Sequence, residues 1–494
     1  MADFGARFGN HQENTGIYIF EAWRQGLIVS MVPMGALGGS PFAGWLADFR
    51  GRRSAISGTA FAALVGTAIE ISASNWIQYI IGRLISGLSV GCLSVIVPMY
   101  LSESAPAHLR GILVSGYQLF ITLGILIAEI VNLGTHRNPG SASWRIPTGL
   151  GFVWATILGV GMLFLPESPR FAFRCGRHLE ARTTIARLLG VNRDDPIVSI
   201  LINDIRVKLL EEQSQGGKAR WTDIFRRKLS RRLFIGVVLM AGQQLTGANF
   251  FFYFGTTVFK GAGVTDPYVT QMILGAVNVL CTLGGLWVVG NVGRRKALIC
   301  GALWMAMCFL VFAFVGKYML DPLNPMSTPA AGMIMIIFSC FFIAAFASTW
   351  GPLVWAVVAE LYPAPNRGPA MAVATAFNWL FNTLISIFTR PIIDQIGFMY
   401  GLVFAGCCIF LAVFVYLLLI ESKDRTLEEI ETLYNSRTSA RKSARLLGPN
   451  TPGPSELDIP LQDTEATAVN AGNANNGSKR DGSRSDNPEV VNVE

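Results

Sequence analysis

Residues 398–420 read FMYGLVFAGCCIFLAVFVYLLLI and contain no charged side chain. A helix needs roughly 20 mostly apolar residues to cross the hydrocarbon core of a bilayer, so this run predicts a membrane-spanning helix. The same criterion finds ten more spans, and we therefore expect eleven. They cover residues 25–47, 54–73, 78–100, 113–134, 145–165, 233–259, 270–289, 297–315, 332–358, 369–389 and 398–420.

The composition agrees with this assignment. The chain has 494 residues, of which 51% are hydrophobic and 15% are charged, whereas soluble domains carry about 25% charged residues. A water-soluble protein of this composition would expose large apolar patches and aggregate. The formal net charge is +8, but most basic residues lie between the apolar segments, so membrane topology explains them better than nucleic-acid binding. The sequence predicts an all-α membrane protein.

Several classes of site are not expected. Seven of the eight cysteines lie within apolar segments, where they are typical of small buried side chains and not of disulfides or metal ligands. The sequence contains no phosphate-binding glycine loop, metal-ligand cluster or catalytic triad. The glycine-rich stretch 82–91 lies inside a span, where glycine favours close helix packing. We therefore expect no enzyme activity, no metal and no cofactor.

Basic residues in the short loops predict the orientation, because they accumulate on the cytoplasmic side. Residues 50–53 follow the first span, 294–296 follow the seventh, and 166–232 form a long basic segment between the halves. These loops are an even number of spans apart, so they share the cytoplasmic side with the tail. An odd number of spans then places Met1 on the opposite face.

The sequence also repeats itself. Gly51-Arg52-Arg53 returns as residues 293–295, the phrase at 102–111 returns at 359–368, and Glu167-Ser168 returns as Glu421-Ser422. Three similar phrases in the same order indicate two homologous helix bundles. Parallel repeats of this kind place the substrate near mid-membrane, between the halves.

The repeat exposes a missing element. The second half opens with span 233–259, and its counterpart would precede span 25–47, where the chain has only a short polar segment. We interpret the first half as lacking one helix; a protein with eleven genuine spans is the alternative. The predicted organisation is a polar N-terminal segment (1–24), an N-terminal bundle of five spans (25–165), a cytoplasmic linker with short helices (166–232), a C-terminal bundle of six spans (233–420) and a largely disordered cytoplasmic tail (421–494).

The repeated phrases resemble the sugar-porter family of the major facilitator superfamily. The motifs that carry the resemblance are residues 48–53, 82–83, 102–111, 166–170, 243–249, 351–355, 421–423 and 427–429. The sequence of residues 243–259 is most similar to those of fungal hexose transporters. The resemblance implies the major facilitator fold, with two pseudo-symmetric helix bundles and eleven spans here in place of twelve. The helix that is missing carries, in many members, an acidic residue tied to proton coupling.

Mid-span amides are candidate sugar contacts, because an amide both donates and accepts hydrogen bonds, as a hydroxyl does. Unpaired amides in lipid cost several kcal/mol, so they should face a wet cavity; hydrogen bonding between helices is the alternative. The resemblance implies polar sugar contacts at Gln118, Gln243, Gln244, Asn249, Asn278 and Asn378. Tyr253 and Trp355 would flank the sugar, although Trp355 is nearly as well explained by packing. Gly351-Pro352 would break its helix at a moving gate.

Charged residues at the cytoplasmic helix ends are candidate gating bridges, which would lock the outward-facing state and release in the inward-facing one. We expect Glu103 near Arg110, Glu360 near Arg367, and Glu167 near Arg170. The complete predicted set is Asp48, Arg52, Glu103, Arg110, Glu167, Arg170, Arg294, Glu360, Arg367 and Glu421. Ordinary positive-inside charge is the alternative.

Arg83 lies within a span, where a cation needs a partner or water. Glu70 and Glu129 are candidate partners, and extension of the side chain to the outer surface is the alternative. Arg83 is therefore a candidate coupling residue, and its role stays open.

The predicted function is transport of a monosaccharide, such as glucose, by alternating access in the plasma membrane. The protein would act as a uniporter or as a proton symporter. A sugar sensor that signals through the tail and an inactive truncated transporter are the alternatives. The expected partners are the sugar, protons in the symporter case, and the lipid bilayer, but no nucleic acid.

Overall fold

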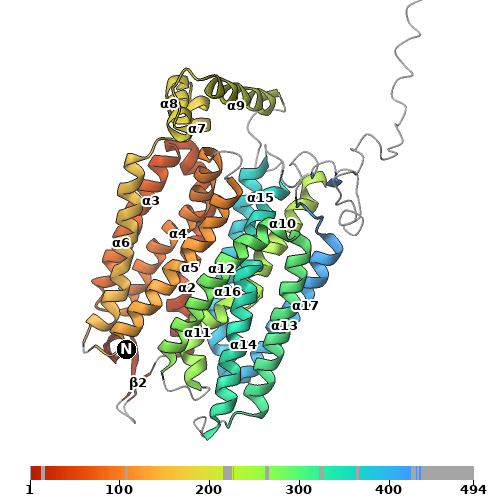
Figure 1. Ribbon diagram of the computed structural model, residues 1–494. Coiled ribbons are helices and arrows are strands. Elements are labelled where there is room, and N and C mark those ends of the chain that lie inside the picture. Colours follow the sequence, from red (N-terminus) through yellow and green to blue (C-terminus); the bar gives the residue numbers. More distant parts are fainter. Residues whose placement is uncertain are drawn as a thin grey trace, which may run out of the picture. The chain divides into compact units, whose positions relative to one another are not determined.

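The computed structural model describes residues 2–12, 17–19, 21–105, 110–138, 140–214, 225, 227–261, 266–321, 327–362, 366–423, 430 and 433–434. Most of the predicted tail, from residue 435 onward, lies outside this set. Figure 1 shows long helices running side by side.

Five long helices form the first half of the bundle. They are α2 (Ala22–Arg50), α3 (Arg52–Ile71), α4 (Trp76–Ser104), α5 (Arg110–Thr135) and α6 (Ala142–Phe164). The second half contains α10 (Arg227–Leu245), α11 (Ala248–Gly261), α12 (Pro267–Asn291), α13 (Arg294–Tyr318), α14 (Pro329–Ser348), α15 (Trp350–Leu361), α16 (Arg367–Ile396) and α17 (Tyr400–Leu418).

Ten segments of the described chain are long and apolar enough to cross a membrane. The longest, Gly368–Leu418, has 51 residues and comprises α16 and α17 with the short 3₁₀ helix η4 (Gly397–Met399) between them. Each of the eleven predicted spans therefore corresponds to one long helix or to a pair of consecutive helices. The predicted all-α membrane fold is confirmed.

The remaining elements are short. The linker forms α7 (Pro169–Arg174), α8 (His178–Leu189) and α9 (Pro196–Ser214). The polar N-terminal segment forms α1 (Ala2–Phe8) and two paired strands, β1 (Asn10–Gln12) and β2 (Ile17–Ile19). Figure 1 shows the N-terminus at the end of the bundle opposite to α7, α8 and α9, as the charge pattern predicts.

The N-terminal segment is anchored by aromatic side chains. Phe4 and Phe8 of α1 contact Trp144 of α6, with ring centroids 5.9 and 5.4 Å apart. Trp144 Nε1 donates a hydrogen bond to Asp3 at 2.9 Å, and this bond lowers the pKa of the Asp3 carboxyl. The sequence pattern predicts only a polar segment here, and hydrophobicity alone does not indicate these aromatic contacts.

Helix α2 packs against both α4 and α16, and α5 packs against α12. The two halves therefore meet along these last two pairs. The contact of α2 with α4 depends on glycine: a Cβ at Gly87 would lie 2.2 Å from the carbonyl oxygen of Val32. This close approach confirms that the glycines of 82–91 serve helix packing.

Two of the predicted spans are interrupted. The span at 233–259 divides into α10 and α11 at Gly247, which has φ +91°; the prediction of one continuous helix was wrong here. Glycine adopts this φ without the steric cost that other residues incur. The span at 332–358 divides at Thr349, with φ −127° and ψ −81°, two residues before the predicted break at Gly351-Pro352. Both interruptions fall within the second half.

Candidate functional site

The predicted amides converge on the interruption between α14 and α15. Gln243 of α10 donates through Nε2 to the carbonyl oxygens of Trp350 and Gly351, both at 3.0 Å. Gln118 of α5 approaches from the first half, since its Nε2 lies 3.4 Å from the position of a Cβ on Gly351. Gly351 has no side chain, so amides from both halves come close to the same backbone.

A second amide cluster continues from Gln243. Asn378 of α16 donates through Nδ2 to Gln243 Oε1 at 2.9 Å and to the carbonyl of Met240 at 2.8 Å. Gln244 donates to Asn378 Oδ1 at 2.8 Å, and Asn249 donates to Gln244 Oε1 at 2.5 Å. Four of the six predicted amides thus form one network across α10, α11 and α16. In this arrangement they join helices, which was the alternative to sugar contact.

The predicted aromatic contacts lie beside residues that sequence reasoning missed. Trp355 of α15 meets Tyr117 of α5 edge to face, with centroids 6.1 Å apart. Tyr253 of α11 donates to Asn382 Oδ1 of α16 at 3.2 Å while 36% of Tyr253 remains exposed. Asn382 lies four residues after Asn378 on the same helix face, so helical spacing could have indicated it. Tyr117 directly precedes Gln118, and adjacent helical residues point in different directions, so spacing did not indicate Tyr117.

Asn278 of α12 does not join this network. The residue is buried, and its Oδ1 has no hydrogen-bond partner among the described residues. A buried amide oxygen without a partner is costly. Asn278 therefore retains a free acceptor inside the bundle.

Arg83 of α4 lies near Glu70 of α3, within range of electrostatic interaction. Glu70 also accepts a hydrogen bond from Ser86 Oγ at 2.7 Å, and the Arg83 guanidinium carbon lies 5.7 Å from the ring centroid of Tyr79. Glu129, the other candidate partner, is hydrogen-bonded to Gln271 instead. Of the two acids, Glu70 is the one that the structure brings to Arg83.

Four charged residues of the first half and one serine form a compact set that we call the first cluster: Asp48, Arg52, Glu103, Glu167 and Ser168. Arg52 binds both carboxylate oxygens of Glu103 at 3.1 Å and also contacts Asp48 at 3.2 Å. Ser168 donates to Glu103. Glu167 accepts hydrogen bonds from the backbone N–H groups of Arg52, at 2.9 Å, and Arg53, at 3.1 Å.

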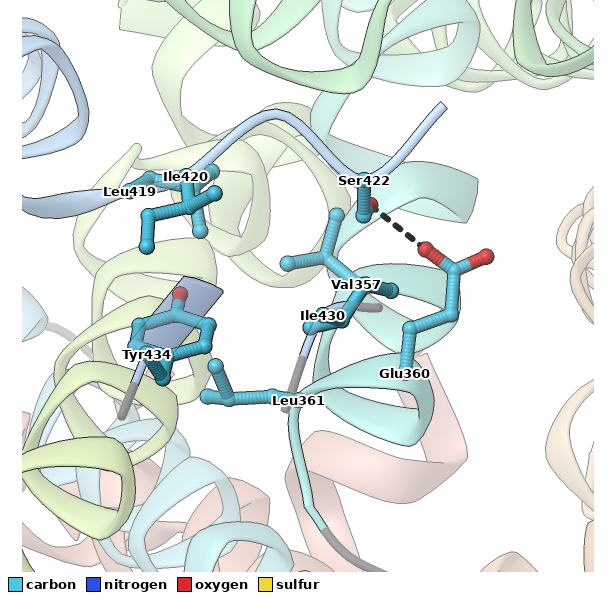
Figure 2. A pocket seen from close by; sticks show the side chains of 8 residues that line it. All are labelled: Val357, Glu360, Leu361, Leu419, Ile420, Ser422, Ile430 and Tyr434. Atoms are coloured by element: carbon cyan, nitrogen blue, oxygen red, sulfur yellow. Dashed lines mark hydrogen bonds between the residues drawn. The ribbon is translucent and has the colours of Figure 1, made fainter. Parts of the chain in front are cut away.

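The second cluster repeats this arrangement with Arg294, Glu360, Glu421 and Ser422. Arg294 contacts Glu360 at 3.5 Å, and Glu421 accepts from the backbone N–H groups of Arg294, at 2.8 Å, and Arg295, at 3.2 Å. Ser422 Oγ donates to Glu360 at 2.6 Å. Figure 2 shows this last bond beside a small pocket lined also by Ile430 and Tyr434.

The pairs differ from those expected. Glu167 does not pair with Arg170 in the described chain; its carboxylate caps the start of α3, because the first N–H groups of a helix lack partners within it. Glu103 binds Arg52, and Glu360 binds Arg294. The side chains of Arg110 and Arg367 lie outside the described residues. Each cluster joins helices of its own half.

Ion pairs between the halves were not predicted, yet one occurs at the opposite end of the bundle. Arg137, just after α5, binds Asp266 at the start of α12 at 2.7 Å. His136 stacks on Tyr268 with centroids 4.3 Å apart. Among the described residues, the ion pairs between the halves are confined to this end.

Comparisons with known proteins agree with this architecture. Residues 2–434 match the family model described as "Sugar (and other) transporter". The chain is 42% identical over 440 residues to the high-affinity fructose transporter ght6 of Schizosaccharomyces pombe, covering 88% of this chain and 82% of that protein. It is 42% identical over 459 residues to the hexose transporter HXT13 of Saccharomyces cerevisiae, covering 92% and 81%.

A solved structure shares the fold. The proton:xylose symporter XylE of the major facilitator superfamily, bound to 6-bromo-6-deoxy-D-glucose, superimposes with a TM-score of 0.72 at 26% identity, covering 87% of this chain and 93% of that chain. The family match spans both halves and the linker between them. The chain belongs to the sugar transporter family of the major facilitator superfamily, and it is a multi-pass membrane transporter and not an enzyme.

Proposed function

We propose that the protein carries a hexose such as glucose across the plasma membrane by alternating access. The observation that supports this most is the amide network of Gln243, Gln244, Asn249 and Asn378 beside the two helix interruptions. The names of the relatives support the substrate class, since they are hexose and fructose transporters.

The network suits a sugar for a chemical reason. A sugar hydroxyl both donates and accepts, so it can replace either partner of an amide–amide hydrogen bond without leaving a buried group unpaired. Tyr253 and Trp355 would cover the apolar C–H face of the sugar ring. Gln118 and Asn278 would complete the contacts, the former from the first half and the latter with its unpaired oxygen.

The interruptions suit a moving gate. Helices α11 and α15 are short segments whose connections, at Gly247 and Thr349, lie next to the amides. A change of backbone angles at such a connection redirects a short helix without disturbing the long one beside it. Binding of a sugar to Gln243 would therefore alter the contact that holds α10 to the start of α15.

The ten predicted charged residues are proposed to form the cytoplasmic gate. The first and second clusters each fasten helix ends within one half, which supports movement of the halves as rigid bodies. The Arg137–Asp266 pair supports closure at the opposite end. The basic loops support a cytoplasmic position for α7–α9 and for the tail.

Uptake of labelled glucose into cells that lack hexose transporters tests the proposal. We expect uptake by the native chain and a fall of roughly 10- to 100-fold for Gln243→Ala combined with Asn249→Ala, because each lost contact of this kind is worth about 1 kcal/mol or more. Asn291→Ala is the matched control, since its amide is exposed at the end of α12 and, among the described residues, bonds only the carbonyl of Trp287.

Loss of uptake has to be separated from loss of folding. Gln243 also holds the α14–α15 interruption, so membrane abundance is measured for every variant, and Asn249→Ala is tested alone. Full uptake by the double variant would contradict the site. A native chain that triggers glucose signalling without uptake would support a sensor instead.

A further inference from the structure

Glu129 is a buried carboxyl group at the contact between the halves. It lies on α5, is only 7% exposed, and faces Gln271 of α12, which is also 7% exposed. Gln271 Nε2 donates to Glu129 Oε1 at 3.4 Å, while Glu129 Oε2 has no hydrogen-bond partner among the described residues. The carboxyl therefore has one long hydrogen bond and one unoccupied oxygen.

No cation neutralises this carboxyl in the described part of the chain. Helix α12 contains no charged residue, and no Lys, Arg or His of the described residues lies within 4.0 Å of Glu129. The charged groups on the packed elements are engaged elsewhere or lie at helix ends. Besides Glu129, the charged and titratable groups on α5, on α12 and on the helices packed against them are Tyr79, Arg83, Cys92, Tyr100, Glu103, Arg110, Tyr117, Arg145, Tyr253, Lys260, Tyr268, Cys281, Cys340 and Glu360, with His136, Arg137 and Asp266 next to the ends of α5 and α12.

Gln271 also has an oxygen without a hydrogen-bond donor among the described residues. Its Nε2 also donates to the carbonyl oxygens of Phe251, at 3.1 Å, and Phe252, at 3.3 Å, but its Oε1 has no partner among the described residues. Two buried acceptors, Glu129 Oε2 and Gln271 Oε1, thus lack a donor. A single proton on the carboxyl supplies that donor, because a protonated carboxyl donates one hydrogen bond.

Two glycines make room for this pair. A Cβ at Gly275 would lie 1.8 Å from Glu129 Oε2, and a Cβ at Gly255 would lie 2.2 Å from Gln271 Oε1. Neither side chain could take its position if these residues were alanine. The same α12 helix carries Gly284, where a Cβ would meet nothing within 4 Å.

We propose that Glu129, together with Gln271, is a proton-binding site that links the proton to the sugar site through α11. The proposal rests on the proposed function, because α11 also carries the sugar contacts Asn249 and Tyr253. Gln271 is the connection, since one amide group bonds both the carboxyl and the carbonyls of α11.

The two protonation states use Gln271 differently. When the carboxyl is protonated, its O–H donates to Gln271 Oε1 and the amide N–H groups stay on Phe251 and Phe252. When the proton leaves to water, the carboxylate attracts the amide N–H groups and draws them from α11. An ionised carboxylate that is buried without a partner is costly, so proton release requires α5 and α12 to separate enough to admit water.

Purified protein in liposomes tests this. Exchange of labelled glucose against internal glucose reports transport, and glucose accumulation driven by an inward proton gradient reports coupling. We expect both for the native chain. Glu129→Gln should lose gradient-driven accumulation, and its exchange rate should no longer vary with pH, because the amide carries its hydrogens at every pH. Gly275→Ala should show the same defect in coupling, while Gly284→Ala should match the native chain.

The outcomes separate the two proposals. Exchange by the native chain without any proton-driven accumulation would overturn the proton site but leave sugar transport intact, whereas the absence of exchange would overturn transport itself. Accumulation that survives Glu129→Gln would also overturn the site. If Glu129→Gln does not exchange glucose, proton binding is measured directly with a pH-sensitive dye in a weakly buffered solution of the protein. Addition of glucose should change the number of bound protons in the native chain but not in Glu129→Gln. An equal dye signal from both proteins would overturn the site.

Discussion

The two clusters of charged side chains share one plan but differ in strength. In both, a glycine without a capping side chain precedes the helix, and a glutamate from a distant segment caps the first backbone N–H groups. In the first cluster, two guanidinium nitrogens of Arg52 donate to the carboxylate of Glu103, and the Arg52 side chain is 3% exposed. In the second, Arg294 makes one contact of 3.5 Å to Glu360 and is 15% exposed.

Neighbouring residues explain the difference. Asp48, four residues before Arg52 and near the end of α2, binds Arg52, whereas the corresponding residue of the second half is Gly290. Phe171 of α7 also lies under the Arg52 guanidinium, with 5.0 Å to the ring centroid. The cap and the Arg–Glu pair are therefore common to both halves, while the additional contacts that hold Arg52 come from Asp48 and Phe171, which lie outside the repeated phrases.

Removal of the two arginines should show the largest contrast. We expect Arg52→Ala to lower the free energy of unfolding by about 3 kcal/mol, because Glu103 then stays buried without its cation. Arg294→Ala should cost about 1 kcal/mol, because its pair is longer and more exposed. Denaturation of the purified proteins in one detergent gives both values, and equal losses would remove the claimed asymmetry.

The two glycines should differ less. A Cβ at Gly51 would lie 2.3 Å from Glu167 Oε2, and a Cβ at Gly293 would lie 2.5 Å from Glu421 Oε2, so each alanine displaces its cap. Gly51 alone has a positive φ, +90°, against −61° for Gly293. Gly51→Ala should therefore cost about 1–2 kcal/mol more than Gly293→Ala. The same denaturation assay measures this difference, and a larger loss for Gly293→Ala would contradict the backbone argument.

Asp48 should give the smallest effect. It binds Arg52 and Arg174 but is more than one-third exposed, so Asp48→Asn should cost about 0.5 kcal/mol. The reciprocal change, Gly290→Asp, should bring the second cluster closer to the first and reduce the gap between the arginine variants. An unchanged gap in the Gly290→Asp background would show that Asp48 does not account for the difference.

Sequence patterns predicted the spans well because hydrophobicity and length are local properties. Span 398–420 corresponds to α17, and the interruption near Gly351-Pro352 lies two residues away, at Thr349. The interruption at Gly247 was missed, although the glycine is visible in the sequence, because an apolar span usually tolerates a glycine without breaking.

The contacts of the site were harder to predict. The sequence identified Gln243, Gln244, Asn249 and Asn378 through the family resemblance, but not that they bond one another. Glu167 was expected beside the nearby Arg170, yet it caps a helix that starts more than 100 residues earlier. Such pairs depend on how helices distant in the sequence pack together, and local sequence patterns do not predict that packing.

Counterflow is the most direct test of hexose transport by alternating access. Liposomes containing the protein are loaded with unlabelled glucose, and a trace of labelled glucose is added outside. A carrier that alternates predicts a transient accumulation of label above its equilibrium level. Unlabelled internal sugar occupies the inward-facing sites, returns them to the outside and leaves few of them free to export the label. The experiment is repeated with fructose in place of glucose. Internal label that never exceeds its equilibrium level with either sugar would contradict transport of a hexose by alternating access.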